Sequence, residues 1–166
     1  MARRPVVGVM GAGDEASETD MRLAETLGQL VASEGWALLT GGRNVGVMQA
    51  ASRGAKRVSG SLVIGVLPSD KDVVSPDVDV AILTGLGNAR NAINVLSSQV
   101  VVAVGVGGAG TASEAALALK AKRPLVLLGP SKEAEAFFRT LGGVIFVADR
   151  AEEVREIIKS HRLLGI

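Results

Sequence analysis

The stretch Gln99–Ala118, QVVVAVGVGGAGTASEAALA, is the most informative part of this chain for both fold and function. Its β-branched apolar run, Val100–Val104, is typical of a buried strand. The glycine-rich run Gly105–Gly110 follows, and Thr111 opens an alanine-rich segment typical of a helix. A buried strand that ends in glycines at a helix N-terminus leaves backbone N–H groups pointing outward, with a positive dipole behind them. This stretch therefore predicts an anion-binding loop.

The rest of the chain repeats this alternation of short apolar runs and segments of helical periodicity. One such segment carries a buried apolar stripe from Leu23 to Val31. The alternation predicts a Rossmann-like, doubly wound α/β fold: a mostly parallel sheet with helices on both faces, in a single domain over residues 1–166. The seven predicted strands are Val6–Met10, Ala37–Thr40, Leu62–Leu67, Val80–Leu83, Gln99–Val104, Leu125–Leu128 and Val144–Val147.

Residues that favour helix N-termini precede the helical segments. Ser17 with Asp20, and Asp149 with Glu152, have the spacing of a capping box, in which side chain and backbone bond reciprocally. Beyond the first helix, we expect helices to begin near Asn44, Asn88, Thr111, Ser131 and Asp149.

Composition narrows the classes of function. The chain has 166 residues, a net charge of +1, no cysteine and one histidine, His161, near its C-terminus. These features argue against disulfides, cysteine nucleophiles, catalytic triads and metal sites, so we predict no metal ligands. Lysine and arginine are dispersed without a basic block or an aromatic platform, which argues against nucleic acid. The apolar runs are too short for a membrane span or a signal peptide, so we expect a cytoplasmic protein without a membrane partner.

Glycines gather at the carboxyl ends of four predicted strands. Ligands collect at that edge of an open parallel sheet. Polar side chains, including Asn88, accompany these glycines, so the sequence predicts a pocket there. The candidate binding residues are Gly11, Gly13, Gly41, Gly42, Arg43, Asn44, Arg90, Asn91, Gly107, Gly108, Ala109, Gly110 and Thr111.

Two nucleotide-binding patterns are not satisfied. Gly105, Gly107 and Gly110 match G-x-G-x-x-G after a strand. A dinucleotide site also needs an acidic residue about 20 positions further on, at the end of the next strand. The next predicted strand ends in Leu128–Ser131, which contains no carboxylate. The phosphate-loop pattern G-x-x-x-x-G-K-[ST] does not occur either.

Two charged residues near these loops have alternative interpretations. Thr111 and Glu114 have capping-box spacing, but a carboxylate one turn inside an anion pocket also suits a general acid or base. Arg90 is expected in the first turn of a helix, where a cation is unfavourable with the helix dipole. An anionic ligand opposite Arg90 would explain that position, and Arg43 after its two glycines invites the same hypothesis.

These loops resemble the Lonely Guy superfamily of Rossmann-like proteins, older members of which were labelled lysine decarboxylases. Gly41–Met48 is similar to the motif G-G-G-x-x-G-x-M, and Val106–Glu114 is similar to P-G-G-x-G-T-x-x-E. The superfamily includes phosphoribohydrolases in which an arginine and the motif glutamate cleave the N-glycosidic bond of a nucleoside 5′-monophosphate. Arg90 and Glu114 match those two positions, so the resemblance leaves this catalytic function open as an alternative.

Departures from the hydrolase pattern favour the molybdenum cofactor carrier branch of the superfamily. Arg90–Asn91 stands where the hydrolases have Arg-Lys, and Ser113–Glu114 stands where they have two glutamates. Gly85–Ser98, GLGNARNAINVLSS, and Gly35–Arg43, GWALLTGGR, are similar to the carrier branch. This resemblance implies a protein that binds, protects and delivers molybdenum cofactor without catalysing a reaction.

The resemblance also implies roles and partners. The glycine loops would supply backbone donors, Arg43 and Arg90 would supply charge, and Asn44 and Asn91 would bond to the pterin edge. The carrier would form a homodimer or homotetramer through helices between Asn88 and Leu119, and would contact a molybdoenzyme transiently.

Overall fold

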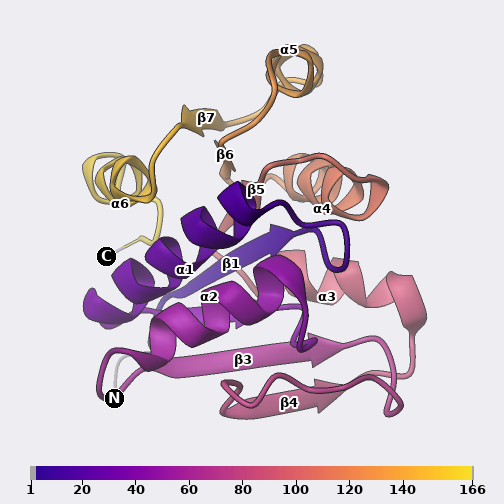
Figure 1. The fold of residues 1–166 in the computed structure, drawn as a ribbon. Helices are drawn as coiled ribbons and strands as arrows, with labels where there is room; N and C mark the ends of the chain where they lie inside the picture. Colours follow the sequence, from indigo (N-terminus) through magenta and orange to yellow (C-terminus); the bar gives the residue numbers. More distant parts are fainter. Residues whose placement is uncertain (1–2, 166) are drawn as a thin grey trace.

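The computed structural model describes residues 3–165 and builds them around one seven-stranded sheet (Figure 1). Every strand pair is parallel, in the spatial order β4-β3-β2-β1-β5-β6-β7. The predicted parallel α/β fold is therefore confirmed, and each strand lies within one residue of its predicted bounds. The strands are β1 Val6–Gly11, β2 Ala37–Thr40, β3 Leu62–Leu67, β4 Val80–Leu83, β5 Val100–Val104, β6 Leu125–Leu128 and β7 Ile145–Ala148.

The order of the strands reverses beside β1. The chain builds β2, β3 and β4 on one side of β1 and then returns to place β5 on the other side. The register pairs Val7 with Val100 and Gly11 with Val104, so β1 and β5 end at the same level. Loops that leave neighbouring strands at such a reversal diverge and open a crevice. The topology therefore positions a site beyond the carboxyl ends of β1 and β5.

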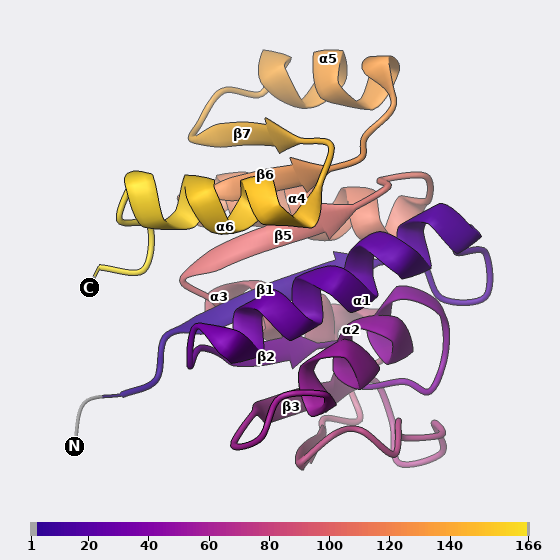
Figure 2. The same cartoon turned by 60° about the vertical axis from the view of Figure 1, so that its left-hand side comes forward.

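The helices form two layers, one on each face of the sheet. Figures 1 and 2 show α1, α2 and α6 on one face and α3 and α4 on the other. The short α5 joins the second layer, because Phe138 packs with Leu125 and Leu127 of β6. No helix within residues 3–165 has both the length and the apolar content that a membrane span requires. The helices are α1 Glu18–Ser33, α2 Gly46–Lys56, α3 Asn91–Leu96, α4 Ala109–Lys120, α5 Lys132–Thr140 and α6 Ala151–Ser160, with a 3₁₀ turn, η1, over Gly87–Arg90.

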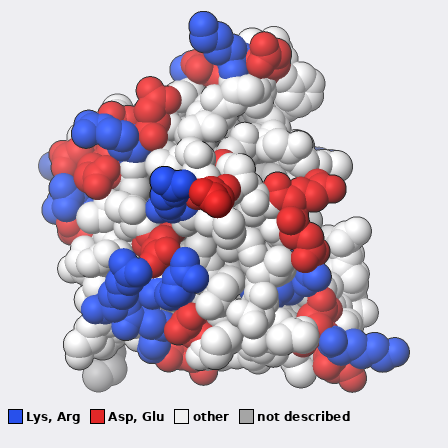
Figure 3. All heavy atoms as spheres, in the orientation of Figure 1, with Lys and Arg blue, Asp and Glu red and all other residues white. Residues whose placement is uncertain are grey.

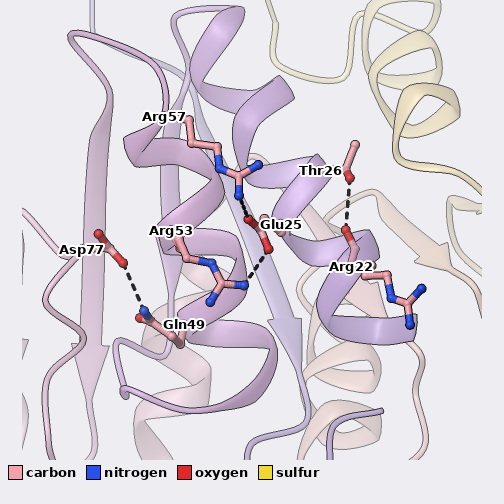
Figure 4. Close-up of polar contacts among 7 residues, drawn as sticks. All are labelled: Arg22, Glu25, Thr26, Gln49, Arg53, Arg57 and Asp77. Carbon is pink, nitrogen blue, oxygen red and sulfur yellow. Dashed lines mark hydrogen bonds and ion pairs between the residues drawn. The ribbon is translucent and has the colours of Figure 1, made fainter. Parts of the chain in front are cut away.

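Helices α1 and α2 are held together by ion pairs as well as by apolar packing. The carboxylate of Glu25 on α1 pairs with Arg53, at 2.5 Å, and with Arg57, both on α2 (Figure 4). The hydrogen bond from Arg53 is the main reason that the pKa of Glu25 is lowered. This arrangement fixes α2 over β1 and β2, and with it the loop that joins β2 to α2.

Some predicted helix starts are confirmed. Ser17 and Asp20 form the expected capping box at α1, and Ser131 caps α5 by accepting a hydrogen bond from the backbone N–H of Ala134. A side-chain cap bonds only to backbone groups two or three residues away, so the local sequence pattern is enough to predict it.

The four other predicted N-cap residues are wrong, although a helix or a 3₁₀ turn begins within two residues of each. Helix α2 follows Val45 rather than Asn44, the segment at Asn88 is the 3₁₀ turn η1, and α4 begins two residues before Thr111. Helix α6 begins after Arg150, and Glu153 rather than Glu152 accepts the backbone N–H groups of Asp149 and Arg150. At α2 and α4, the end of the preceding strand and the glycines after it determine where the helix can start. Both helices therefore begin without a capping hydrogen bond from any described side chain.

Candidate functional site

A pocket of about 430 Å³ lies beyond the carboxyl ends of β1, β2 and β5. This volume falls within the range of sites that hold a small organic molecule. Most of the predicted binding residues line it, because four separate loops converge at the reversal of strand order. Those that do are Gly11, Gly13, Gly41, Arg43, Arg90, Asn91, Gly108, Ala109, Gly110 and Thr111.

Three predicted binding residues do not line the pocket. Gly42 has φ of 74° and packs against β3, where a Cβ would lie 2.8 Å from Leu67 Cδ1. Asn44 is exposed, and its backbone N–H donates to the carbonyl of Val73 instead. Gly107 is exposed, and a Cβ there would meet nothing within 4 Å. These three positions shape the loops rather than the surface of the pocket.

Several lining residues were not among the predicted binding set. The sequence places Asn88 among the polar side chains at this edge and offers Glu114 as a cap or an acid, whereas Met10 and the polar residues of the β1–α1 loop carry no pattern that marks them. The additional lining residues are Met10, Ala12, Asp14, Glu15, Met48, Asn88 and Glu114. Asn94 lies directly behind the pocket and was also missed. Its position four residues after Arg90, on the buried side of α3, is the signal that could have found it.

The N-terminus of α4 supplies backbone donors to the pocket. The first residues of this helix, Ala109, Gly110 and Thr111, all line the pocket. None of the described side chains caps the helix at Gly108. The first N–H groups of an α-helix have no partner within the helix. With the helix dipole behind them, these three N–H groups form an anion-binding surface.

The backbone leading into α4 is strained. Val106, between β5 and α4, is buried and has φ of 52°. A β-branched residue in this left-handed region is an outlier that costs on the order of 1–3 kcal/mol. Such strain persists where surrounding structure holds it, and it is concentrated at functional sites. The turn at Val106 leads into Gly108 and Gly110, which line the pocket.

Arg90 reaches into the pocket from the end of η1 and lies against Gly41. A Cβ on Gly41 would collide with Arg90 Nη1 and would lie 2.6 Å from Met48 Sδ, so glycine at this position makes room for the guanidinium. Arg90 Nε is buried and has no hydrogen-bond partner among the described residues. Burial lowers the pKa of Arg90, while the nearby Glu114 partly offsets that effect. An unsatisfied buried donor on a cation is the feature expected where an anionic ligand binds.

Arg43, the second predicted cation, is already paired. Its Nε lies 3.1 Å from Asp72 Oδ1, and its Nη2 lies 3.9 Å from Asp14 Oδ2. Asp72 belongs to the loop between β3 and β4, which bridges to Arg43 through Val74. Figure 3 shows acidic side chains gathered at the right of the molecule, where Figure 1 places the β1–α1 loop that contains Asp14 and Glu15. Arg43 therefore offers less uncompensated positive charge than Arg90.

Glu114 is not the helix cap that its spacing with Thr111 predicts. Helix α4 begins at Ala109, so Glu114 lies inside the helix, and its carboxylate accepts a hydrogen bond from Asn94 Nδ2 at 3.1 Å. Glu114 is 6% exposed, and Asn94 is fully buried. Burial raises the pKa of Glu114, and the hydrogen bond from Asn94 and the charge of Arg90 only partly oppose this effect. The pocket thus contains a buried acid beside a buried cation.

The whole site suits an anionic ligand with a polar ring. Backbone N–H groups of α4 and the guanidinium of Arg90 suit an oxyanion, and the amides of Asn88 and Asn91 offer both donors and acceptors. The residues that bind an anion thus lie beside amides that can bond to the edge of a heterocycle.

Comparison with known proteins extends this picture. The model of the SLOG cluster4 family matches residues 4–155. An uncharacterized protein of Archaeoglobus fulgidus is 44% identical over 124 residues, which are 75% of this chain and 80% of that protein.

Two solved structures are similar over nearly the whole chain. The molybdenum cofactor binding protein of the phototrophic bacterium Rippkaea orientalis is 52% identical with a TM-score of 0.91, covering 98% of this chain and 99% of that one. The molybdenum cofactor carrier protein of Chlamydomonas reinhardtii is 49% identical with a TM-score of 0.90, covering 99% of this chain and 100% of that one.

Proposed function

Since this chain belongs to the SLOG cluster4 family, we propose that it binds molybdenum cofactor in the pocket beyond β1 and β5, protects it and delivers it without catalysing a reaction. A molybdenum cofactor binding protein and a molybdenum cofactor carrier protein are similar to this chain over nearly their full length. We further propose that the domain spans residues 1–166, acts in the cytoplasm and hands the cofactor to a molybdoenzyme by transient contact.

The observation that carries the proposal is that, within residues 3–165, Arg90 Nε has no partner and no side chain caps the neighbouring N-terminus of α4. The cofactor has a phosphate at one end, an oxo-molybdenum dithiolene at the other and a flat pterin between them. Both ends need donors, which Arg90 and the α4 N–H groups supply. Asn91 lines the pocket and has the donor and acceptor that a pterin edge requires.

Native mass spectrometry after incubation with molybdenum cofactor tests this function. We expect a mass increase equal to the cofactor, retained through buffer exchange, and no retained adenosine monophosphate in a parallel sample. The pocket volume and the amides beside the anion site favour the larger polar ligand. Retention of adenosine monophosphate with no retention of the cofactor would contradict the proposal.

One observation favours phosphoribohydrolase activity as a second candidate function. Glu114 has a raised pKa and lies in the pocket near Arg90, as a general acid would. Asn91 and Ser113 nevertheless stand where the hydrolases have a lysine and a glutamate. Misplacing a substrate by about 1 Å can cost roughly a hundredfold in rate. Assays for free base from adenosine monophosphate and its N6-prenylated form separate the two functions, and base release that Glu114→Gln abolishes would favour the enzyme.

We also propose that the chain forms a homo-oligomer through the surface around α3. Leu96 at the end of α3 is 58% exposed, and Leu86 just before η1 is 54% exposed. Leu86 follows the edge strand β4, and Leu96 lies beside Leu117 of α4. Exposed apolar side chains of this kind are typical of an interface between copies of a chain. This surface includes part of the predicted interface segment from Asn88 to Leu119.

Replacing Leu96 with aspartate should shift the assembly toward monomer, because burying an unpaired charge in an interface is unfavourable. Light scattering at micromolar concentration measures the mass. The matched control is Phe137→Asp, which also places a charge at an exposed apolar position, 57% exposed, on α5 near the opposite sheet edge. A wild-type chain that is already monomeric, or equal dissociation of both variants, would contradict this interface.

A further inference from the structure

Glu114 lies in the pocket in an arrangement that suits both of its protonation states. The carboxylate accepts from Asn94 Nδ2, and that is its one hydrogen bond within residues 3–165. Asn94 Oδ1 is buried and has no partner among the same residues. Half a turn about the last side-chain bond of Asn94 would exchange its two ends. The amide can therefore donate to a carboxylate or accept from a carboxylic acid, with little change in packing.

Arg90 is the cation near Glu114 that an anionic ligand would also contact. Arg90, from η1, faces Glu114, and Arg43, from the β2–α2 loop, is paired with Asp72 and Asp14. Glu15, from the β1–α1 loop, also lines the pocket and adds negative charge. An arriving oxyanion would engage Arg90 and would bring its own negative charge close to Glu114. Both effects act against the charged form of Glu114.

We propose that Glu114 takes up one proton from solvent when an anionic group enters the pocket, so that affinity for the ligand increases as the pH falls. This regulation rests on the proposed function, because it concerns the same pocket. The proton goes to a carboxylate oxygen of Glu114, and the O–H then donates to Asn94 Oδ1 after the amide has turned. Release of the ligand returns the proton to solvent.

The direction of the pH effect follows from linkage between proton and ligand. Burial already raises the pKa of Glu114 in the empty pocket, and an anion would raise it further. Affinity is therefore highest below the pKa of the empty pocket and lowest above the pKa of the occupied pocket. Between these two values, affinity falls by up to about tenfold for each unit of pH. A local rise in pH would favour release of the ligand.

Carboxyl ¹³C NMR on the full chain, labelled in glutamate, tests the proton uptake directly. The probe is sodium sulfate, which stays doubly charged over the titration, compared with sodium chloride at equal ionic strength. We expect the titration midpoint of Glu114 to be higher in sulfate than in chloride. Equal midpoints for Glu114 in the two salts would overturn the inference.

Retention of molybdenum cofactor across the same pH range separates this inference from the proposed function. We expect affinity to fall with rising pH for the wild type and for Glu152→Gln, and to stay nearly constant for Glu114→Gln. Retention with the same pH dependence in all three proteins would overturn the proton uptake but leave the carrier function intact. A sulfate-dependent midpoint without cofactor retention would support the proton uptake and contradict the carrier function. If Glu114→Gln does not fold, the wild-type titration decides alone, with Glu114 assigned through its backbone.

Discussion

Replacing Gly54 with alanine is expected to destabilise the fold by about 3 kcal/mol, at the upper end of the usual cost of overpacking. Gly54 on α2 lies against the backbone of α1, where its Cβ would collide with the carbonyl oxygen of Glu25. The same close approach occurs at Gly28 on α1, where a Cβ would collide with the carbonyl oxygen of Ala51 on α2. The helices would have to separate, which would also disturb the ion pairs of Glu25 with Arg53 and Arg57 (Figure 4).

The expected loss of stability is informative, because the change in helix propensity alone would stabilise the protein. Alanine in place of glycine inside a helix favours the helix by about 1 kcal/mol. Urea unfolding, followed by fluorescence of Trp36, measures the stability, since the single tryptophan is only 6% exposed. Gly110→Ala is the matched control, because Gly110 is also helical and its Cβ would meet nothing within 4 Å. A midpoint for Gly54→Ala equal to that of the wild type would show that α1 and α2 do not need this close approach.

Replacing Arg90 with methionine is expected to weaken retention of molybdenum cofactor by about 1–3 kcal/mol, or roughly fivefold to more than a hundredfold. Methionine keeps an apolar side chain at this position but removes the guanidinium that lies against Gly41, with its charge and its Nε donor, which has no partner within residues 3–165. Stability should change less than affinity, because Arg90 forms no ion pair within residues 3–165 and its Nε has no hydrogen-bond partner there.

Equilibrium dialysis against the cofactor measures the loss, with Arg22→Met as the control. Arg22 is an exposed arginine on α1 whose partner is Glu18, so its removal leaves the pocket unchanged. Equal affinity of Arg90→Met and the wild type, with both proteins folded, would remove Arg90 from the binding site.

The pattern of the sequence predicted the sheet well because strand identity depends on short-range features. Runs such as Val100–Val104 and Leu125–Leu128 are apolar on both faces, as strands covered by two helix layers must be. Topology then placed the glycine loops at one edge, since the carboxyl ends of parallel strands meet there. This is why most predicted binding residues line one pocket although they lie far apart in the sequence.

The sequence predicted helix starts less well, and the errors affect how Glu114 is interpreted. Spacing alone cannot separate a capping box from a pair of residues already inside a helix. At α4 the strained turn at Val106 lets the helix begin at Ala109, which leaves Thr111 and Glu114 within it. Glu114 then meets Asn94 of another helix instead of its own N-terminus. That contact spans 20 residues of sequence and has no local signature.

By itself the sequence determined the fold class, the strands and the edge of the sheet where ligands collect, because periodicity and glycine placement act over a few residues. Only the tertiary structure decided which charges remain available at that edge. Arg43 is paired with Asp72 from a different loop, whereas Arg90, beside Glu114, has a buried Nε donor with no partner among the described residues. Burial and pairing depend on segments brought together by folding, so the charge balance of the pocket follows from packing and not from any single stretch of the chain.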